Sequence, residues 1–175
     1  VFTGLCRIHS ESKIVNKDIR PSNLMILPTV STSVEPDLDN NKSKIIITDW
    51  GTGASINSPV FPFEGSIITA SNTILQALID DDRTAVYSAE DDLESLLKTI
   101  FLFFNPNDYL DNTFEAAASI LDFWQKQAEI STPFKDALEG LHSKNFSKVY
   151  NYLETLTGAI GMKRKLGASH DNVPS

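Results

Sequence analysis

Ile14–Ile26 reads IVNKDIRPSNLMI, which places Asp18 five residues before Asn23. A second aspartate, Asp49, ends the strand-like run in IIITDWG. The carboxylate of Asp18 can accept a hydroxyl proton. Asn23 and Asp49 supply the hard oxygen ligands that Mg²⁺ needs when it holds nucleotide phosphates. The spacing therefore predicts the metal-binding and proton-accepting half of a phosphotransferase site.

Two short apolar runs beside these residues are rich in isoleucine and have the composition of strands. We expect Leu24–Leu27 and Lys44–Thr48 to form a small β-hairpin. The inserted hairpin loop, 28–43, contains two prolines and many polar residues. This composition predicts an exposed connection that carries no core.

Downstream of the hairpin, apolar residues recur at three- and four-residue steps, which is the spacing of helices that pack against a core. Ser88 and Asp91 have the pattern of a capping box and open a buried central helix over 88–105. Further helices are expected to begin at Asn112, at Thr132 and at Asn145, the last of them ending at Gly158. Residues 159–175 have no apolar period, so we expect a disordered tail there.

The first residues of the chain also have a helical pattern. Val1, Leu5 and Ile8 lie on one face of a helix, which suggests the last turns of a helix that begins upstream. The chain is therefore expected to be a fragment of a longer protein.

Composition limits the class of protein. The chain has 175 residues, of which 41% are hydrophobic and 22% charged, as expected for one globular domain. Its net charge of −8 argues against a general binder of nucleic acid or anionic membranes. The longest apolar stretch, Leu96–Phe104, contains Lys98 and is shorter than the roughly 20 residues of a membrane helix. The single cysteine, Cys6, favours a reducing, intracellular location in the cytoplasm or nucleus.

Other titratable residues carry no metal-binding pattern. His9, His142 and His170 have no ligand spacing, and we expect them to lie at the surface or to cap helices. The acidic run Asp80-Asp81-Asp82 is expected to be a solvated loop, because adjacent loop residues seldom converge on one ion.

In its motifs the chain resembles the C-terminal lobe of eukaryotic protein kinases. The family pattern H-R-D-x-x-x-x-N is met by Asn16-Lys17-Asp18 with Asn23, and D-F-G by Asp49-Trp50-Gly51. Gly65–Leu75, GSIITASNTIL, is similar to the end of a kinase activation segment. Asp91–Leu96, DDLESL, is similar to the start of the helix buried beneath the catalytic loop. The sequences of these two segments most resemble those of the casein kinase I branch and of fungal-type kinases, including the kinase domains of crinkler-type effectors.

The resemblance implies a mainly α-helical, kinase-like C-lobe over 1–158, with an activation segment over 49–73. It also implies ATP and Mg²⁺ as cofactors, and transfer of the γ-phosphoryl group to serine or threonine hydroxyls of a protein substrate. Asp18 would be the catalytic base, and Arg20 would contact the transferring phosphate in place of the usual lysine. Asn23 and Asp49 would bind the metal and, through it, the nucleotide.

Three further residues would support the site. Lys17 keeps a basic residue at the arginine position of the family pattern. Gly51 would permit the sharp backbone turn after the metal ligand. Asp92 would tie the buried helix to the backbone of the catalytic loop by accepting N–H bonds.

The sequence also departs from the family. Asn16 replaces the histidine that packs beneath the metal-binding turn, and Ser71-Asn72-Thr73 lacks the glutamate of the usual ion pair. No glycine-rich loop with a following strand lysine occurs in the 175 residues, so the N-terminal lobe is absent and nucleotide binding is expected only where one is supplied. We therefore expect the isolated chain to be inactive. The sequence does not indicate its oligomeric state.

Two alternatives stay open. The chain could belong to a pseudokinase or to a lobe-only binding or effector protein. It could also belong to a small-molecule phosphotransferase of the aminoglycoside or choline kinase type, which shares D-x-x-x-x-N and I-x-D-W. The GSIITASNTIL and DDLESL segments favour a protein kinase over this second alternative.

Overall fold

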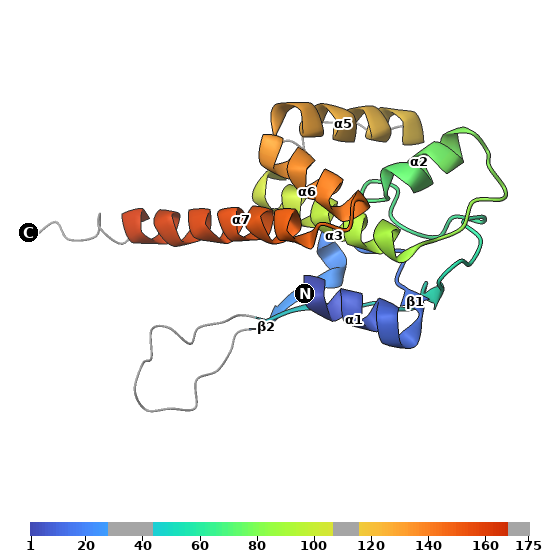
Figure 1. The fold of residues 1–175 in the computed structure, drawn as a ribbon, viewed down its shortest axis with the longest axis horizontal. Helices are drawn as coiled ribbons and strands as arrows, with labels where there is room; N and C mark the ends of the chain where they lie inside the picture. Colours follow the sequence, from blue (N-terminus) through green and yellow to red (C-terminus); the bar gives the residue numbers. More distant parts are fainter. Residues whose placement is uncertain (28–43, 107–115, 168–175) are drawn as a thin grey trace, which may run out of the picture. The chain divides into compact units, whose positions relative to one another are not determined.

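The computed structural model describes residues 1–27, 44–106 and 116–167, with side chains described over 1–25, 45–106 and 116–156 (Figure 1). This part of the chain is mainly helical, as the sequence predicted, with two small antiparallel sheets. The elements are α1 (Phe2–Ser12), β1 (Ile14–Val15), a 3₁₀ turn (Pro21–Asn23), β2 (Leu24–Leu27), β3 (Lys44–Ile47), β4 (Ala54–Ser55), α2 (Asn72–Ile79), α3 (Ala89–Phe104), α5 (Ala117–Ile130), α6 (Thr132–His142) and α7 (Phe146–Gly167). They divide into two compact units, Val1–Trp124 and Gln125–Ser175.

The predicted hairpin is confirmed. β2 and β3 pair antiparallel, with Leu24 opposite Ile47 and Leu27 opposite Lys44. The loop 28–43 lies outside the described residues. A second pair was not predicted: β1 pairs antiparallel with β4, with Val15 opposite Ala54. This second pairing returns the chain after Asp49 to the strand that precedes Asp18.

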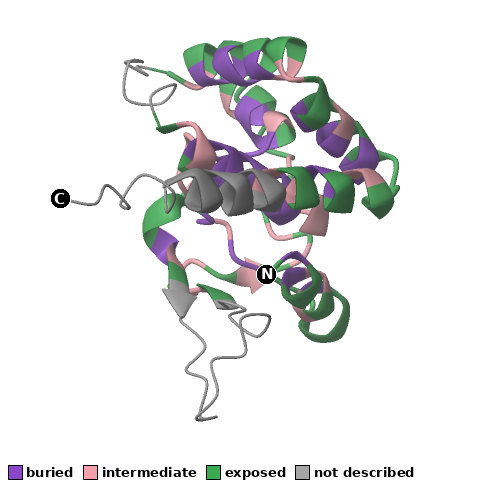
Figure 2. Cartoon of the chain, turned by 90° about the vertical axis from the view of Figure 1, so that its left-hand side faces the viewer, coloured by how far each residue is buried: buried purple, intermediate pink, exposed green. Residues whose placement is uncertain are grey.

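The predicted central helix is α3, and its capping box is present. The Ser88 side chain accepts from the backbone N–H of Asp91, and the Asp91 side chain accepts from the N–H of Ser88. Every residue from Asp91 to Leu102 is buried, including four charged ones (Figure 2). α1 packs against α3 in the same unit. A helix buried on all sides needs hydrogen-bond partners for its polar side chains, and loops of the first unit provide them.

Aromatic packing extends the core of the first unit. The Trp124 ring is fully buried and meets Phe101 and Phe123 edge to face, with ring centroids 5.8 and 4.9 Å apart. Its indole N–H donates to the carbonyl of Ile68 at 2.7 Å. The segment before α2 is thereby fixed to the core by a hydrogen bond as well as by apolar burial.

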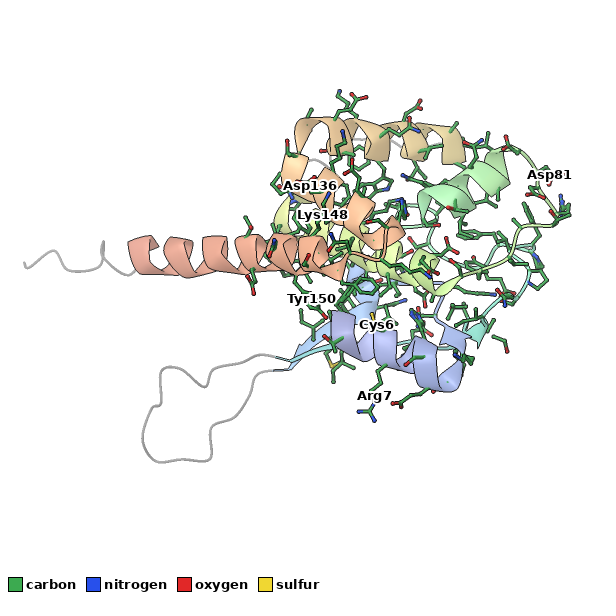
Figure 3. The ribbon with its side chains drawn as sticks, in the orientation of Figure 1. Cys6, Arg7, Asp81, Asp136, Lys148 and Tyr150 are labelled. Carbon is green, nitrogen blue, oxygen red and sulfur yellow. The ribbon has the colours of Figure 1, made fainter. Side chains whose placement is uncertain are left out.

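The second unit contains the packed pair α6 and α7. Phe134 and Tyr152 meet across this pair, with ring centroids 5.9 Å apart. Lys148 lies beside two carboxylates of α6, with its Nζ 3.6 Å from Asp136 and 3.4 Å from Glu139 (Figure 3). Burial of the Tyr152 hydroxyl raises its pKa.

The structure corrects several expectations. α7 continues to Gly167, so the predicted end at Gly158 is wrong, as is the disordered tail over 159–167; 168–175 lie outside the described residues. A helical glycine costs only about 1 kcal/mol relative to alanine, so Gly158 is a weak stop signal. The start expected at Asn112 falls outside the described residues. α2, which was not predicted as a helix, begins at a Ser71 side chain that accepts from the N–H of Ile74.

The expected exposure of the histidines and of Asp80–Asp82 is confirmed only in part. His9 is buried, not at the surface, because Asp92 supplies a partner for its ring. His142 is exposed near the end of α6, and Asp80–Asp82 form an exposed segment, as expected. Cys6 is a free, half-buried thiol whose pKa is raised by burial. Among the described residues, no helix is long and apolar enough to cross a bilayer.

Candidate active site

Asp18 lies in the turn between β1 and the 3₁₀ turn, with its carboxylate almost wholly buried. Oδ2 accepts a hydrogen bond from Asn23 Nδ2 at 2.8 Å and lies 3.2 Å from Arg20 Nε. Within the described part of the chain, Oδ1 accepts no hydrogen bond. One carboxylate oxygen is therefore fixed, and the other is available to accept a proton from a hydroxyl.

Asn23 is held so that its amide oxygen stays available. Its Nδ2 donates both to the carboxylate and to the backbone carbonyl of Asp18, the latter at 2.9 Å. Its backbone carbonyl accepts from the N–H of Thr48 at 2.8 Å. Since both amide hydrogens point at Asp18, Oδ1 accepts no hydrogen bond from the described residues and is available as a hard ligand.

The register of the hairpin brings Asp49 to the same end as Asn23. Leu24 pairs with Ile47, so the residue before β2 and the residues after β3 are neighbours in space. Asp49 is exposed, has a left-handed backbone with φ 55°, and accepts from the N–H of Gly51 at 3.2 Å. An amide oxygen and a carboxylate fit Mg²⁺, which typically takes one or two protein ligands besides phosphate and water.

No cluster of three or more His, Cys, Asp or Glu side chains forms a metal site in the part of the chain that the structure describes. A magnesium site at Asn23 and Asp49 would therefore depend on ligands from phosphate and water. This donor set suits a metal that arrives with a nucleotide rather than a resident structural ion.

Asn16 joins the two halves of the site, a role the sequence did not suggest. The side chain is fully buried; its Nδ2 donates to the carbonyl of Asp49 at 3.0 Å, and its Oδ1 accepts from the N–H of Asp18 at 3.0 Å. Thr52 Oγ1 donates to the Asn16 carbonyl at 2.9 Å. Where the family pattern has histidine, the amide of Asn16 links the loop that carries Asp18 to the turn at Asp49.

Asp92, predicted to support the catalytic loop, accepts hydrogen bonds from the backbone of Asn16 and Lys17. Its Oδ2 accepts from the N–H of Asn16 at 2.6 Å, and its Oδ1 from the N–H of Lys17 at 3.0 Å. His9 Nε2 lies 3.0 Å from the same Oδ2. The carboxylate is buried in α3, so these charge-assisted bonds fix the loop to the rigid centre of the first unit.

Lys17 connects the loop that carries Asp18 to the segment that contains Glu64. Its backbone is left-handed, with φ 70°, and its Nζ lies 3.9 Å from Glu64 and 5.0 Å above the ring centroid of Tyr87. Burial raises the pKa of the Tyr87 hydroxyl, and Asp91, Asp92, Glu64 and Asp18 raise it further. The tyrosine ring thus lies next to Lys17 as a neutral, cation-binding face.

Gly51 differs from its predicted role. No described glycine has a positive φ, and the left-handed turn falls on Asp49. A Cβ at Gly51 would lie 3.2 Å from Asp49 Oδ1, so the glycine makes room for the carboxylate rather than allowing an unusual backbone. Aspartate tolerates the left-handed region better than most residues, which explains the exchange of roles.

Arg20, which was predicted to contact a phosphate, lies beside Asp18. Its side chain is about half exposed, with relative exposure 46%, and its Nε lies next to Asp18. The guanidinium therefore offers its remaining N–H groups to the solvent side of the site.

A second layer of polar contacts was missed from the sequence. Thr69 and Thr99 both donate to the carbonyl of Ile19, at 2.7 and 2.9 Å. Ser71 donates to Asp91 Oδ1. Together these bonds tie the segment before α2 and the helix α3 to the residue that follows Asp18.

Glu94 and Lys98 form the deepest part of this layer. Glu94 Oε1 accepts from the backbone N–H of Asn72 at 2.8 Å and lies 3.0 Å from Lys98 Nζ. Lys98 also donates to Asn72 Oδ1 at 2.9 Å and to the carbonyl of Ala70. This pair fixes Ala70 and Asn72 at the start of α2. The spacing of Glu94 and Lys98, with Asp91, on one face of an apolar helix was the available sequence signal.

No protein-family model matches the chain, and a search of curated proteins found no match. The functional assignment therefore depends on the residues and contacts described above.

Proposed function

We propose that the chain is the C-terminal catalytic lobe of an ATP-dependent protein kinase, which transfers the γ-phosphoryl group to serine or threonine hydroxyls. The observation that supports this most directly is the environment of Asp18. One carboxylate oxygen is held by Asn23, and the other is uncommitted among the described residues. A buried carboxylate with one free oxygen suits a base that must orient and deprotonate an alcohol.

Asn23 and Asp49 would hold Mg²⁺ through their side-chain oxygens. When bound, the metal would neutralise charge on the nucleotide phosphates. Arg20 would place its exposed guanidinium beside the transferring group while its Nε stays near Asp18. The adenine would require a second lobe, and for that reason we expect the 175-residue chain alone to show no saturable thermal shift with Mg·ATP.

A protein acceptor is favoured over a small molecule by the segment before α2. Thr69 and Ser71 tie this segment to the residue after Asp18 and to α3. The segment is therefore held next to the base as a rigid surface, along which an extended acceptor peptide could lie. We also propose an intracellular location, because the reaction requires ATP and Mg²⁺.

Metal binding can be tested on the chain as it stands. Mn²⁺, used as a paramagnetic substitute for Mg²⁺, should broaden the NMR signals of Asn23 and Asp49 selectively. Asp49→Asn should weaken the broadening, while Asp81→Asn, an exposed aspartate on the α2–α3 connection (Figure 3), should leave it unchanged. Equal broadening in both variants would refute the proposal that Asp49 binds the metal.

Catalysis can be tested in a protein that joins these 175 residues to a lobe with a glycine-rich loop and a strand lysine. Asp18→Asn should reduce Mg²⁺-dependent transfer to serine and threonine peptides by about 10³-fold or more. Asp81→Asn should have no effect. Full transfer by Asp18→Asn would refute the base assignment, and nucleotide binding without transfer in the unmodified protein would favour a pseudokinase.

A further inference from the structure

We propose that the groove between α2 and the extended segment 85–87 is a docking site for a short, extended segment of a partner protein, whose apolar residues are flanked by lysine or arginine. The docked segment pairs with the open backbone edge of Val86 and places its cations beside Asp80 and Asp82. This inference does not depend on the proposed kinase function, because none of the proposed catalytic or metal-binding residues lines the groove.

The segment 85–87 is extended and is paired along one side only. On that side it meets the segment 57–60: the Ala85 carbonyl accepts a backbone N–H from 57–60 at 2.9 Å, and the Tyr87 N–H donates to a carbonyl of 57–60 at 2.9 Å. These bonds flank Val86, which forms an antiparallel bridge. In such a bridge, the N–H and C=O of the flanked residue point away from the paired segment. Val86 therefore directs both groups outward, and neither has a hydrogen-bond partner among the described residues.

The open edge is short, because side chains occupy the N–H groups that would continue it. Asp82 Oδ1 accepts from the N–H of Thr84 at 2.9 Å, and Asp91 Oδ2 accepts from the N–H of Ser88 at 2.7 Å. Short edges of this kind limit unwanted pairing between sheets. Val86 can still exchange two backbone hydrogen bonds with one residue of an added strand. The edge therefore suits a short peptide segment rather than a second sheet.

The groove beside this edge has room for side chains and offers them apolar surface. Its volume is about 540 Å³, and residues of α2 line it together with Ala85 and Val86. Ile74 and Ala77 of α2 are buried, whereas the Val86 side chain is 46% exposed. Alternate side chains of an extended segment point to opposite sides, so a strand paired with Val86 can place apolar side chains against this surface. The groove thus favours apolar residues at the centre of the docked segment.

The charge of the groove favours a basic segment. Asp80 and Asp82 line the groove and are exposed, and in each carboxylate one oxygen has no hydrogen-bond partner among the described residues. The neighbouring Arg83 is already paired with Asp81, at 2.6 Å (Figure 3). With three carboxylates and one guanidinium, residues 80–83 carry a net charge of −2. Lysine or arginine in the docked segment would complement this charge, and an acidic segment would be repelled.

The experiment is an NMR titration of the 175-residue chain with peptides whose ends are blocked. The basic peptide is Lys-Arg-Val-Val-Val-Arg-Lys. The second peptide has Glu and Asp in place of the basic residues, and the third is the basic peptide N-methylated at its valines, which prevents strand pairing in any register. The basic peptide should shift the Val86 amide signal saturably and slow its hydrogen exchange by about tenfold, while the Tyr87 amide should be protected throughout. The N-methylated peptide should bind about tenfold more weakly or worse, and the acidic peptide should not bind.

Two substitutions of exposed residues separate the groove from general attraction to an acidic protein. Asp80→Lys reverses a charge in the groove and should weaken binding of the basic peptide by about tenfold. Asp122→Lys makes the same change in net charge on α5, outside the groove, and should weaken binding less than about twofold.

Equal weakening in Asp80→Lys and Asp122→Lys would overturn the docking site. The same conclusion would follow if the basic peptide gave no saturable shift, or if the N-methylated peptide bound equally well. A Val86 amide as protected as that of Tyr87 before peptide is added would also overturn it, because the edge would then be covered already. The comparison of the peptides needs no variant, so it decides the question even if Asp80→Lys does not fold.

Discussion

The carboxylate of Asp92 accepts the backbone N–H of Asn16 at 2.6 Å, although 76 residues separate them in the sequence. This bond joins the best-buried helix of the first unit to the loop that carries the proposed base. The side chains of α3 from Asp91 to Leu102 are buried and therefore fixed by packing. Because the loop is hydrogen-bonded to one of these side chains, its motion is restricted too.

Asp92→Asn should lower the free energy of unfolding by about 3 kcal/mol. The substitution removes the charge that strengthens three hydrogen bonds and places an amide group against backbone donors. Urea unfolding followed by circular dichroism measures the change. Asp122→Asn, on an exposed position of α5, is the control and should stay within about 0.5 kcal/mol of the original protein. Similar losses in both variants would refute the anchoring role.

Gly65→Ala should be strongly destabilising because of a close backbone contact. A Cβ at Gly65 would lie 2.0 Å from the carbonyl oxygen of Lys17, a distance that forces the segment around Gly65 away from the loop that carries Asp18. We expect a loss of about 3 kcal/mol in urea unfolding. Gly4→Ala is the matched control: no atom lies within 4 Å of its Cβ, and alanine should stabilise α1 by about 1 kcal/mol. If both glycines accept alanine equally, the contact does not constrain the loop.

The hairpin and the central helix could be predicted because their signals are local. β2 (LMIL) and β3 (KIII) are short, mostly apolar runs, and α3 combines a capping box with a three- and four-residue apolar period. The spacing of Asp18 and Asn23 likewise predicted their proximity, which their hydrogen bond bears out.

The buried polar contacts could not be predicted, because they join distant parts of the chain. His9 and Asp92 are 83 residues apart, and nothing in the local sequence of either indicates the other. A lone histidine is usually placed at the surface, but a buried carboxylate reverses that preference. α2 was missed for a different reason: its sequence, NTILQALI, has only eight residues, about two turns, which is too short to show a clear helical period.

Lys98→Met should lower the free energy of unfolding by roughly 3–5 kcal/mol. Lys98 has no exposed surface, and its removal would take the cation away from the buried carboxylate of Glu94 and leave the Ala70 carbonyl without its lysine donor. Chemical denaturation measures the loss. Lys135→Met, which breaks an exposed pair with Glu139, should cost less than about 1 kcal/mol.

The Lys98 substitution should also alter the dependence of stability on pH. Burial lowers the pKa of Lys98, and Glu94 only partly offsets this effect. Below the unfolded-state pKa of 10.5 the native state therefore holds this proton less tightly than the unfolded chain does. Stability should rise with pH between the lowered native value and 10.5, and Lys98→Met should lack this alkaline rise. An identical alkaline slope in both proteins would contradict the burial of a charged lysine.

Asp91 should make the protein less stable as pH rises above the ordinary aspartate pKa of 3.8. Burial raises the pKa of this carboxyl, and the hydrogen bonds from Ser71 and Ser88 only partly oppose the shift. The native state therefore binds the proton more tightly than the unfolded chain, and ionisation of Asp91 costs stability between 3.8 and the raised native value. Across this window, the stability of the original protein should fall relative to that of Asp91→Asn.

Asp82 provides a control of opposite sign for this measurement. Hydrogen bonds from the side chain and backbone of Thr84 lower the pKa of its exposed carboxyl, so ionised Asp82 favours the native state. Its contribution is present above 3.8 and disappears as pH falls through the lowered native value. As pH increases, the stability of the original protein should therefore rise relative to that of Asp82→Asn. Over the same steps it should fall relative to that of Asp91→Asn. Urea unfolding at pH steps from about 2.5 to 7 tests both, and parallel slopes for the two variants would show that burial does not govern Asp91.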